Sequence, residues 1–180
     1  MIISAAQKEM RTAYLGGFAG QLIAGIIWAI AAAIGTWGSP QLSMAVLFFA
    51  SMFLFPLTQI TLRLIGRPAA LSKNNSLNQL AMETAFIVPI GFVLVAAATL
   101  HKENWFFPAS MIIVGAHYLP FMFLYGMPQF GALASLLIVM GVGIGLYLPD
   151  YFSLGGWASA IAFLAFSLIG LLVVRKEEAS

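Results

Sequence analysis

The side chain with the greatest chemical potential in this sequence is His117, which lies within the apolar stretch 106–125. An imidazole can donate and accept a hydrogen bond, and it can carry a proton near neutral pH. An ionisable group inside a membrane is costly, so it marks either a functional position or a hydrogen bond between helices. The sequence leaves both interpretations of His117 open: a proton or ligand contact, and a structural hydrogen bond.

Four further polar side chains lie in apolar stretches: Tyr118, Glu83, Gln59 and Gln21. Counted from the ends of their predicted helices, Gln21, Gln59 and Glu83 have similar depths, and His117 lies deeper. Inward-facing side chains at these positions would form a polar pathway that ends near His117. The alternative places Glu83 at the lipid headgroups and uses the glutamines as hydrogen-bonding contacts between helices.

The sequence lacks the residues that several kinds of catalytic and metal-binding site require. The chain has no Cys, which excludes thiolate catalysis, disulfides and Cys-ligated metals. It has two His residues, His101 and His117, and it contains no His-Glu-x-x-His, no Gly-x-Ser-x-Gly and no phosphate-binding loop. We therefore expect no metal and no cofactor, and the sequence favours a role other than that of an enzyme.

The composition indicates that the chain is embedded in a lipid bilayer, so membrane-spanning helices are expected to position these residues. Of the 180 residues, 62% are hydrophobic and 8% are charged, whereas a soluble domain carries roughly a quarter charged residues. Six stretches reach the ~20 apolar residues of a spanning helix, and none shows the alternation of a barrel strand. They cover residues 14–36, 42–64, 79–100, 106–125, 129–148 and 153–174. We predict one all-α domain over residues 1–180, a six-helix transmembrane bundle whose partner is the lipid bilayer and not nucleic acid.

The positive charges predict an orientation. With six crossings, seven of the eight Lys and Arg residues share the side of both termini: Lys8, Arg11, Arg63, Arg67, Lys73, Arg175 and Lys176. The opposite side keeps only Lys102. Since cytoplasmic loops carry the excess of Lys and Arg, both termini are predicted to be cytoplasmic. The short loops and low charge favour a bacterial inner membrane.

Prolines within the predicted helices indicate bends. Pro56, Pro89 and Pro120 lie inside the second, third and fourth predicted helices. Each proline removes one helical N–H donor and crowds the carbonyl four residues earlier. We expect kinks at all three positions. Such kinks occur in transporters and channels, where freed carbonyl groups line cavities, and also in bundles without a pathway.

Small residues at four-residue spacing indicate where helices pack closely. Two pairs have this spacing: Gly16 with Gly20, and Gly141 with Gly145. Small side chains let backbones approach in lipid, where helices gain no hydrophobic drive toward one another. The preferred interpretation is packing inside the bundle, and the alternative is a homo-oligomer that uses these glycines.

Three functions remain compatible with these residues. The first is a small transporter or channel for a small solute or proton, with a polar pathway around His117 and Glu83. The second is a structural or accessory membrane protein without transport activity. The third is a membrane-embedded enzyme that acts on a lipid, which requires a lateral opening between helices and a reactive group facing it.

Overall fold

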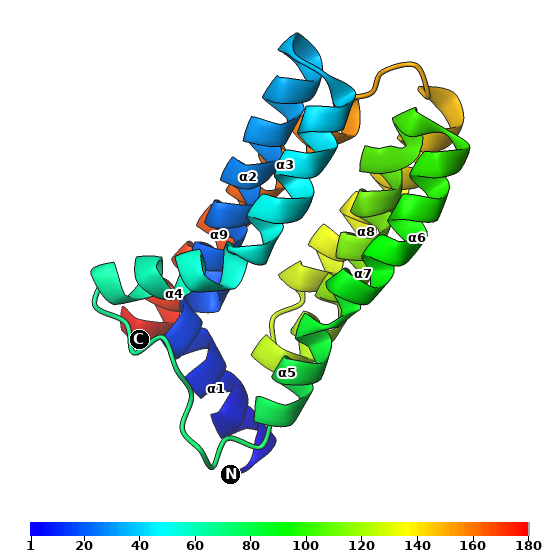
Figure 1. The fold of residues 1–180 in the computed structure, drawn as a ribbon. Helices are drawn as coiled ribbons and strands as arrows, with labels where there is room; N and C mark the ends of the chain where they lie inside the picture. The colour runs from blue at the N-terminus through cyan, green and yellow to red at the C-terminus, as the bar shows by residue number, and fades with distance from the viewer. Residues whose placement is uncertain (180) are drawn as a thin grey trace.

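Residues 1–179 are described by a computed structural model, and within them the regular structure is entirely helical (Figure 1). The α-helices are α1 (Ile3–Tyr14), α2 (Phe18–Trp37), α3 (Pro40–Met52), α4 (Leu54–Leu64), α5 (Asn78–Ala85), α6 (Ile87–His101), α7 (Phe106–Tyr125), α8 (Gln129–Tyr147) and α9 (Leu154–Ala179). Short 3-10 turns at Leu15–Gly17 and Glu103–Trp105 precede α2 and α7. Five helical stretches are long and apolar enough to cross a membrane, or six when α3 and α4 count as one bent span.

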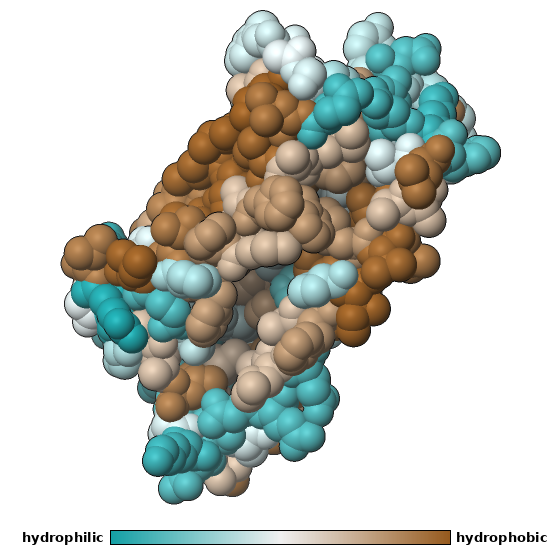
Figure 2. Space-filling view, viewed as in Figure 1, coloured by the Kyte–Doolittle hydropathy of each residue, from teal (hydrophilic) through white to brown (hydrophobic). Residues whose placement is uncertain are grey.

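The spans form two groups that join at the back of the molecule. In Figure 1, α2 packs along α3 and α9 on one side, and α7 packs along α6 and α8 on the other. Helices α7 and α8 both contact α9, which closes the bundle. Where α2, α7 and α9 meet, the Trp28 ring lies 5.9 Å from Phe107 and 5.7 Å from Phe163. Figure 2 shows polar surface at the two ends and an apolar belt between them, as an integral membrane protein requires.

Two of the spans are broken at the predicted prolines. Helix α3 ends at Met52, four residues before Pro56, and α5 ends at Ala85, four residues before Pro89. These are the carbonyl positions that each proline ring crowds and leaves without a helical donor. The kink expected in the second predicted helix is confirmed, since α4 turns away from α3 by 55°. Helices α5 and α6 are separated only by Phe86, whose φ and ψ stay helical, and together they form one spanning stretch.

The bent pair α3–α4 is long enough for one crossing. Helix α3 has 13 residues and α4 has 11. At 1.5 Å per residue, α3 rises about 20 Å, and α4, bent by 55°, adds about 9 Å along the same axis. The combined length of about 29 Å approaches the ~30 Å thickness of the hydrocarbon core.

Helix α7 is not interrupted at Pro120: it runs from Phe106 to Tyr125 with this proline inside it, and a bend at this position stays a prediction. Packing explains the difference. Helix α7 is held between α6 and α8 along its length. By contrast, the residues at the two real breaks, Phe53 and Phe86, are each 61% exposed. Neighbouring helices can thus keep a proline-containing helix continuous where a less supported helix is interrupted.

The N-terminal helix α1 is a second difference from the sequence prediction, which begins the first helix at residue 14. Leu15, Gly16 and Gly17 have φ values of 48°, 59° and 83°. Three successive left-handed residues end α1 at Tyr14, and α2 begins at Phe18. Helix α9 also extends past its predicted end at residue 174, to Ala179.

Helix α1 binds the ends of α7 and α9. The Arg11 guanidinium donates to both carboxylate oxygens of Glu177, at 2.8 and 2.6 Å, and to the carbonyl of Tyr125 at 2.7 Å. Gln7 donates to the carbonyl of Phe123 at 2.6 Å. Carbonyl groups in the last turn of a helix have no helical N–H partner. Side chains of α1 therefore cap α7 while they hold the C-terminal turn of α9.

The loop between α4 and α5 joins the same assembly. The Glu9 carboxylate accepts from the backbone N–H of Ser72 at 2.6 Å and from the Asn75 amide at 2.9 Å. Arg67 donates to both carboxylate oxygens of Glu178, at 2.5 and 2.9 Å, and this pairing raises the pKa of Arg67. The N-terminal helix, this loop and the C-terminal turn therefore gather at one end of the bundle.

The four glycines with helix-packing spacing face other parts of the same chain. A methyl group placed on Gly16 would lie 2.8 Å from the Gly170 carbonyl oxygen, and one on Gly141 would lie 2.8 Å from that of Pro108. Gly145 also faces Pro108, and Gly20 faces Thr58. These contacts assign the glycines to packing within the bundle.

We predict that Arg11→Gln destabilises the protein by about 1–2 kcal/mol, which lowers its melting temperature by about 3–5 °C. The substitution removes the bidentate pair with Glu177 and the cap on Tyr125. Thermal unfolding in detergent measures the effect, and the exposed Arg63→Gln is the matched control. The double variant Arg11→Gln with Glu177→Gln should be only slightly less stable than Arg11→Gln alone, since both substitutions remove the same Arg11–Glu177 pair. Equal melting temperatures for Arg11→Gln and Arg63→Gln would contradict this role of α1.

Candidate functional site

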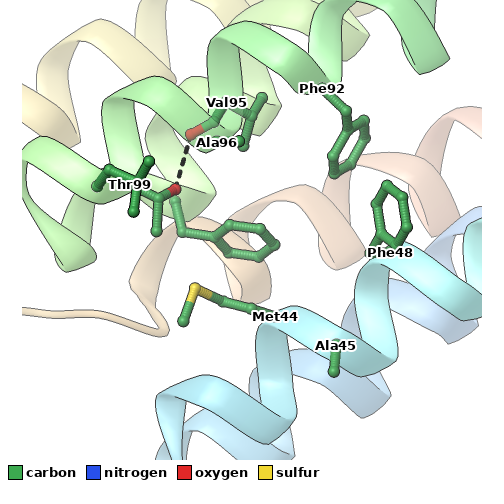
Figure 3. Close-up of a pocket in the computed structure, with 9 residues that line it drawn as sticks. Met44, Ala45, Phe48, Phe92, Val95, Ala96 and Thr99 are labelled. Carbon is green, nitrogen blue, oxygen red and sulfur yellow. Dashed lines mark hydrogen bonds between the residues drawn. The ribbon is translucent and has the colours of Figure 1, made fainter.

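The two broken spans face each other across a cleft. Helix α3 approaches α6 through Phe48 and Phe92, whose ring centroids lie 5.6 Å apart in an edge-to-face contact (Figure 3). A groove of about 390 Å³ lies beside this pair. It is lined by Met44, Ala45, Phe48, Phe92, Val95, Ala96, Thr99, Leu100 and Phe106. Figure 2 shows that the face between α3–α4 and α5–α6 is hollowed, with polar surface inside the hollow.

The groove is chemically apolar. Thr99 is the one polar side chain among the residues that line it, and its hydroxyl donates to the carbonyl of Val95 at 2.7 Å. This hydrogen bond, drawn in Figure 3, occupies the hydroxyl proton. A molecule in the groove would therefore be held by apolar contact and by the exclusion of water, and no charged side chain would select its charge.

His117 lies against the break between α5 and α6. Its Nδ1 is 3.0 Å from the carbonyl oxygen of Thr84, the residue before the end of α5. Since a carbonyl only accepts, Nδ1 carries the proton, and Nε2 of the neutral ring is an acceptor. Within residues 1–179, Nε2 has no hydrogen-bond partner. His117 thus supplies a donor where the helix is interrupted and keeps one nitrogen available.

Tyr118 contacts His117 edge-to-face, with ring centroids 5.6 Å apart, but it does so as part of the aromatic core, and Glu83 makes no contact with the His117 ring. Tyr118 is buried in the aromatic core, stacked on Phe130 at a centroid distance of 6.1 Å and 5.9 Å from Phe163. Glu83 is exposed and accepts a hydrogen bond from Gln79, one turn earlier, at 2.8 Å. These contacts favour the packing interpretation of Tyr118 and the interfacial interpretation of Glu83.

Gln21 and Gln59 retain unpaired polar atoms inside the bundle. Gln21 is 2% exposed, and neither its Oε1 nor the Nε2 of Gln59 has a partner among the described residues. Thr58 Oγ1 is also buried without a partner and lies against Gly20, where α4 crosses α2. Gln59 additionally interacts with the Tyr14 side chain. Buried polar atoms of this kind are normally satisfied by water or a ligand, so the α2–α4 crossing retains polar binding capacity.

The five residues of the predicted pathway therefore do not form one group. His117 lies at the α5–α6 interruption with its ring against Tyr118, and Tyr118 continues into the aromatic core, whereas Glu83 lies at the surface. The glutamines belong to α2 and α4. Among the described residues, no group of three or more His, Asp or Glu side chains could hold a metal ion.

Sequence reasoning missed two parts of the site. The first is the Thr84 carbonyl, which lies next to Ala85, the position four residues before Pro89 where α5 ends. The second is the Phe48–Phe92 contact. Nothing in the sequence distinguishes these two from the thirteen other Phe residues of the chain's fifteen. Only the packing of the two broken spans brings them together.

The comparisons with known proteins identify a family. A family model described as a family of unknown function (DUF7010) matches residues 3–176, so the chain belongs to that family. Neither the curated proteins nor the solved structures contain a match to the chain.

Proposed function

We propose that this member of the family is a six-span membrane transporter that admits a small amphipathic solute to the cleft between α3–α4 and α5–α6. The observation that carries the proposal is the pair of Pro-broken spans that face each other across this cleft. Interrupted membrane helices occur at the substrate sites of transporters, and here the two interrupted spans are consecutive in the chain. The single domain then comprises all six spans.

The side chains at the cleft suit a small amphipathic solute. The groove beside Phe48 and Phe92 offers only apolar contact, which suits a hydrocarbon or aromatic body. His117 does not line this groove, but its acceptor nitrogen lies at the α5–α6 interruption of the same span and suits one hydrogen-bond donor on the solute. The groove volume of about 390 Å³ falls within the ~300–1,000 Å³ typical of small-molecule sites. Protons alone are less well supported, because polar side chains do not continue along the groove.

Uptake of a fluorescent amphipath into proteoliposomes tests the proposal. We use NBD-aminohexanoate as the probe and quench the external fraction with dithionite. Vesicles with the protein should accumulate the probe faster than empty vesicles. His117→Phe should lower the protein-dependent rate about fivefold to tenfold, the value of one lost hydrogen bond of ~1–1.4 kcal/mol. His101→Phe is the matched control, because His101 is exposed at the other end of α6.

A chemical bridge across the cleft gives a second arm of this experiment. The natural chain has no Cys, so Phe48→Cys with Phe92→Cys supplies the only two thiols. Joining them with a short bifunctional thiol reagent should abolish uptake, and each single variant treated in the same way should retain it. An unchanged rate after bridging would exclude the cleft as the route. A rate no higher than that of empty vesicles would favour the accessory role without transport.

The proposal includes an orientation with both termini in the cytoplasm. The charge distribution and the gathering of α1, the 65–77 loop and the C-terminal turn at one end both support it. Single thiols at two exposed positions test it in intact cells. A membrane-impermeant maleimide should label Asp150→Cys from outside and Asn74→Cys only after permeabilisation. Labelling in the reverse order would overturn the orientation.

A further inference from the structure

A second groove lies outside the cleft, between α1 and the segment that follows α4. Its volume is about 430 Å³. Ala5, Lys8, Glu9, Thr12 and Ala13 line it from α1, and Pro68 and Ala70 line it from the loop. The spacing of the α1 residues places them on one face of that helix. The opposite side of α1 is engaged with α7 and α9 through Gln7 and Arg11.

The groove combines one cation that has no ion pair within hydrogen-bond distance with walls that are apolar except at Glu9 and Thr12. Lys8 is exposed and forms no ion pair within residues 1–179. Glu9 also lines the groove, but Ser72 and Asn75 donate to both of its carboxylate oxygens. The Arg11 hydrogen bonds, and to a smaller extent the charge of Lys8, lower the pKa of Glu177. The Glu177 carboxylate itself is held by the two hydrogen bonds from Arg11. The ammonium of Lys8 therefore remains available to an external anion.

The surroundings of the groove favour a membrane lipid as that anion. The end of the bundle that carries α1 holds seven Lys and Arg residues against four carboxylates, Glu9, Glu83, Glu177 and Glu178, which leaves a net charge of +3. Met1, Ile2 and Ile3 are exposed at the start of α1, by 56%, 74% and 51%. An apolar helix start beside basic residues is typical of a segment that lies at the headgroup level. Basic pockets at this level bind anionic headgroups.

We propose that the groove between α1 and residues 68–70 binds one anionic phospholipid. The lipid phosphate pairs with the Lys8 ammonium. The upper part of an acyl chain lies against Ala5, Ala13 and Ala70. The walls exclude water from the chain, and Lys8 selects the charge of the headgroup. This site is independent of the cleft and of the proposed transport.

Native mass spectrometry of the full chain in detergent tests the site. Phosphatidylglycerol and phosphatidylcholine with identical acyl chains are the probes. The protein should bind phosphatidylglycerol more tightly, and Lys8→Gln should weaken that binding about fivefold, which corresponds to ~1 kcal/mol for one surface cation. Lys102→Gln, at the opposite end of the bundle, is the matched control and should leave binding unchanged.

A second variant tests the groove separately from the charge. Ala5 is exposed, so Ala5→Trp can fill the groove while Lys8 stays in place. It should also weaken phosphatidylglycerol binding, with a melting temperature equal to that of the parent. Inorganic phosphate should not displace the lipid. The proposal is overturned if Lys8→Gln binds phosphatidylglycerol as the parent does, if the two lipids bind equally, or if free phosphate competes as effectively as the lipid.

Discussion

Backbone hydrogen bonding in the absence of water is the constraint on which the cleft depends. An unsatisfied backbone group in hydrocarbon costs several kcal/mol, so a proline in a membrane helix must be accommodated by its surroundings. Pro56 and Pro89 are accommodated by ending α3 and α5 four residues earlier. At the second break, His117 of α7 donates to the Thr84 carbonyl. The same interaction holds α5 against α7 and fixes the tautomer of His117.

The end of the bundle that carries α1 is held by more polar contacts than the open face between α3 and α6. At the end that carries α1, Arg11 and Arg67 make bidentate pairs with the last turn of α9, and Glu9 holds the loop. The left-handed residues 15–17 interrupt the helix between α1 and α2, and α1 continues beyond α2 to make these contacts. On the open face, α3 and α6 are linked by the edges of Phe48 and Phe92. Beyond this pair, Gln41 of α3 donates to the Glu103 carboxylate at 2.9 Å. A cleft bounded by a firmly held end and by these few contacts can admit a molecule without loss of the fold.

Much of the fold could be predicted from apolar runs, because a spanning helix has a length that composition alone reveals. The breaks at Pro56 and Pro89 were predictable from proline chemistry, whereas Pro120 was not distinguishable from them without knowledge of the packing around α7. Helix α1 escaped prediction because it is short and polar and lies directly before an apolar run.

The candidate site was predictable only in part. Counting along a helix gives the depth of a residue but not the direction in which it faces. Glu83 and His117 both belong to the predicted pathway, yet Glu83 is exposed on α5, while His117 contacts the Thr84 carbonyl and the rings of the aromatic core. Position along each helix therefore identified which polar side chains lie at similar depths in the membrane. Whether these side chains come together could be decided only from the tertiary packing.

The distance between the two ends of the bent span tests most directly whether a proline shapes the cleft. Spin labels on Leu42→Cys and Leu64→Cys lie at exposed positions of α3 and α4. Pulsed electron paramagnetic resonance should give a backbone separation of about 29 Å for the 55° bend, against about 33 Å for a straight helix. With Pro56→Ala in addition, the separation should lengthen toward the straight value. A parent separation of about 33 Å, or no change on Pro56→Ala, would contradict the proline as the cause of the break.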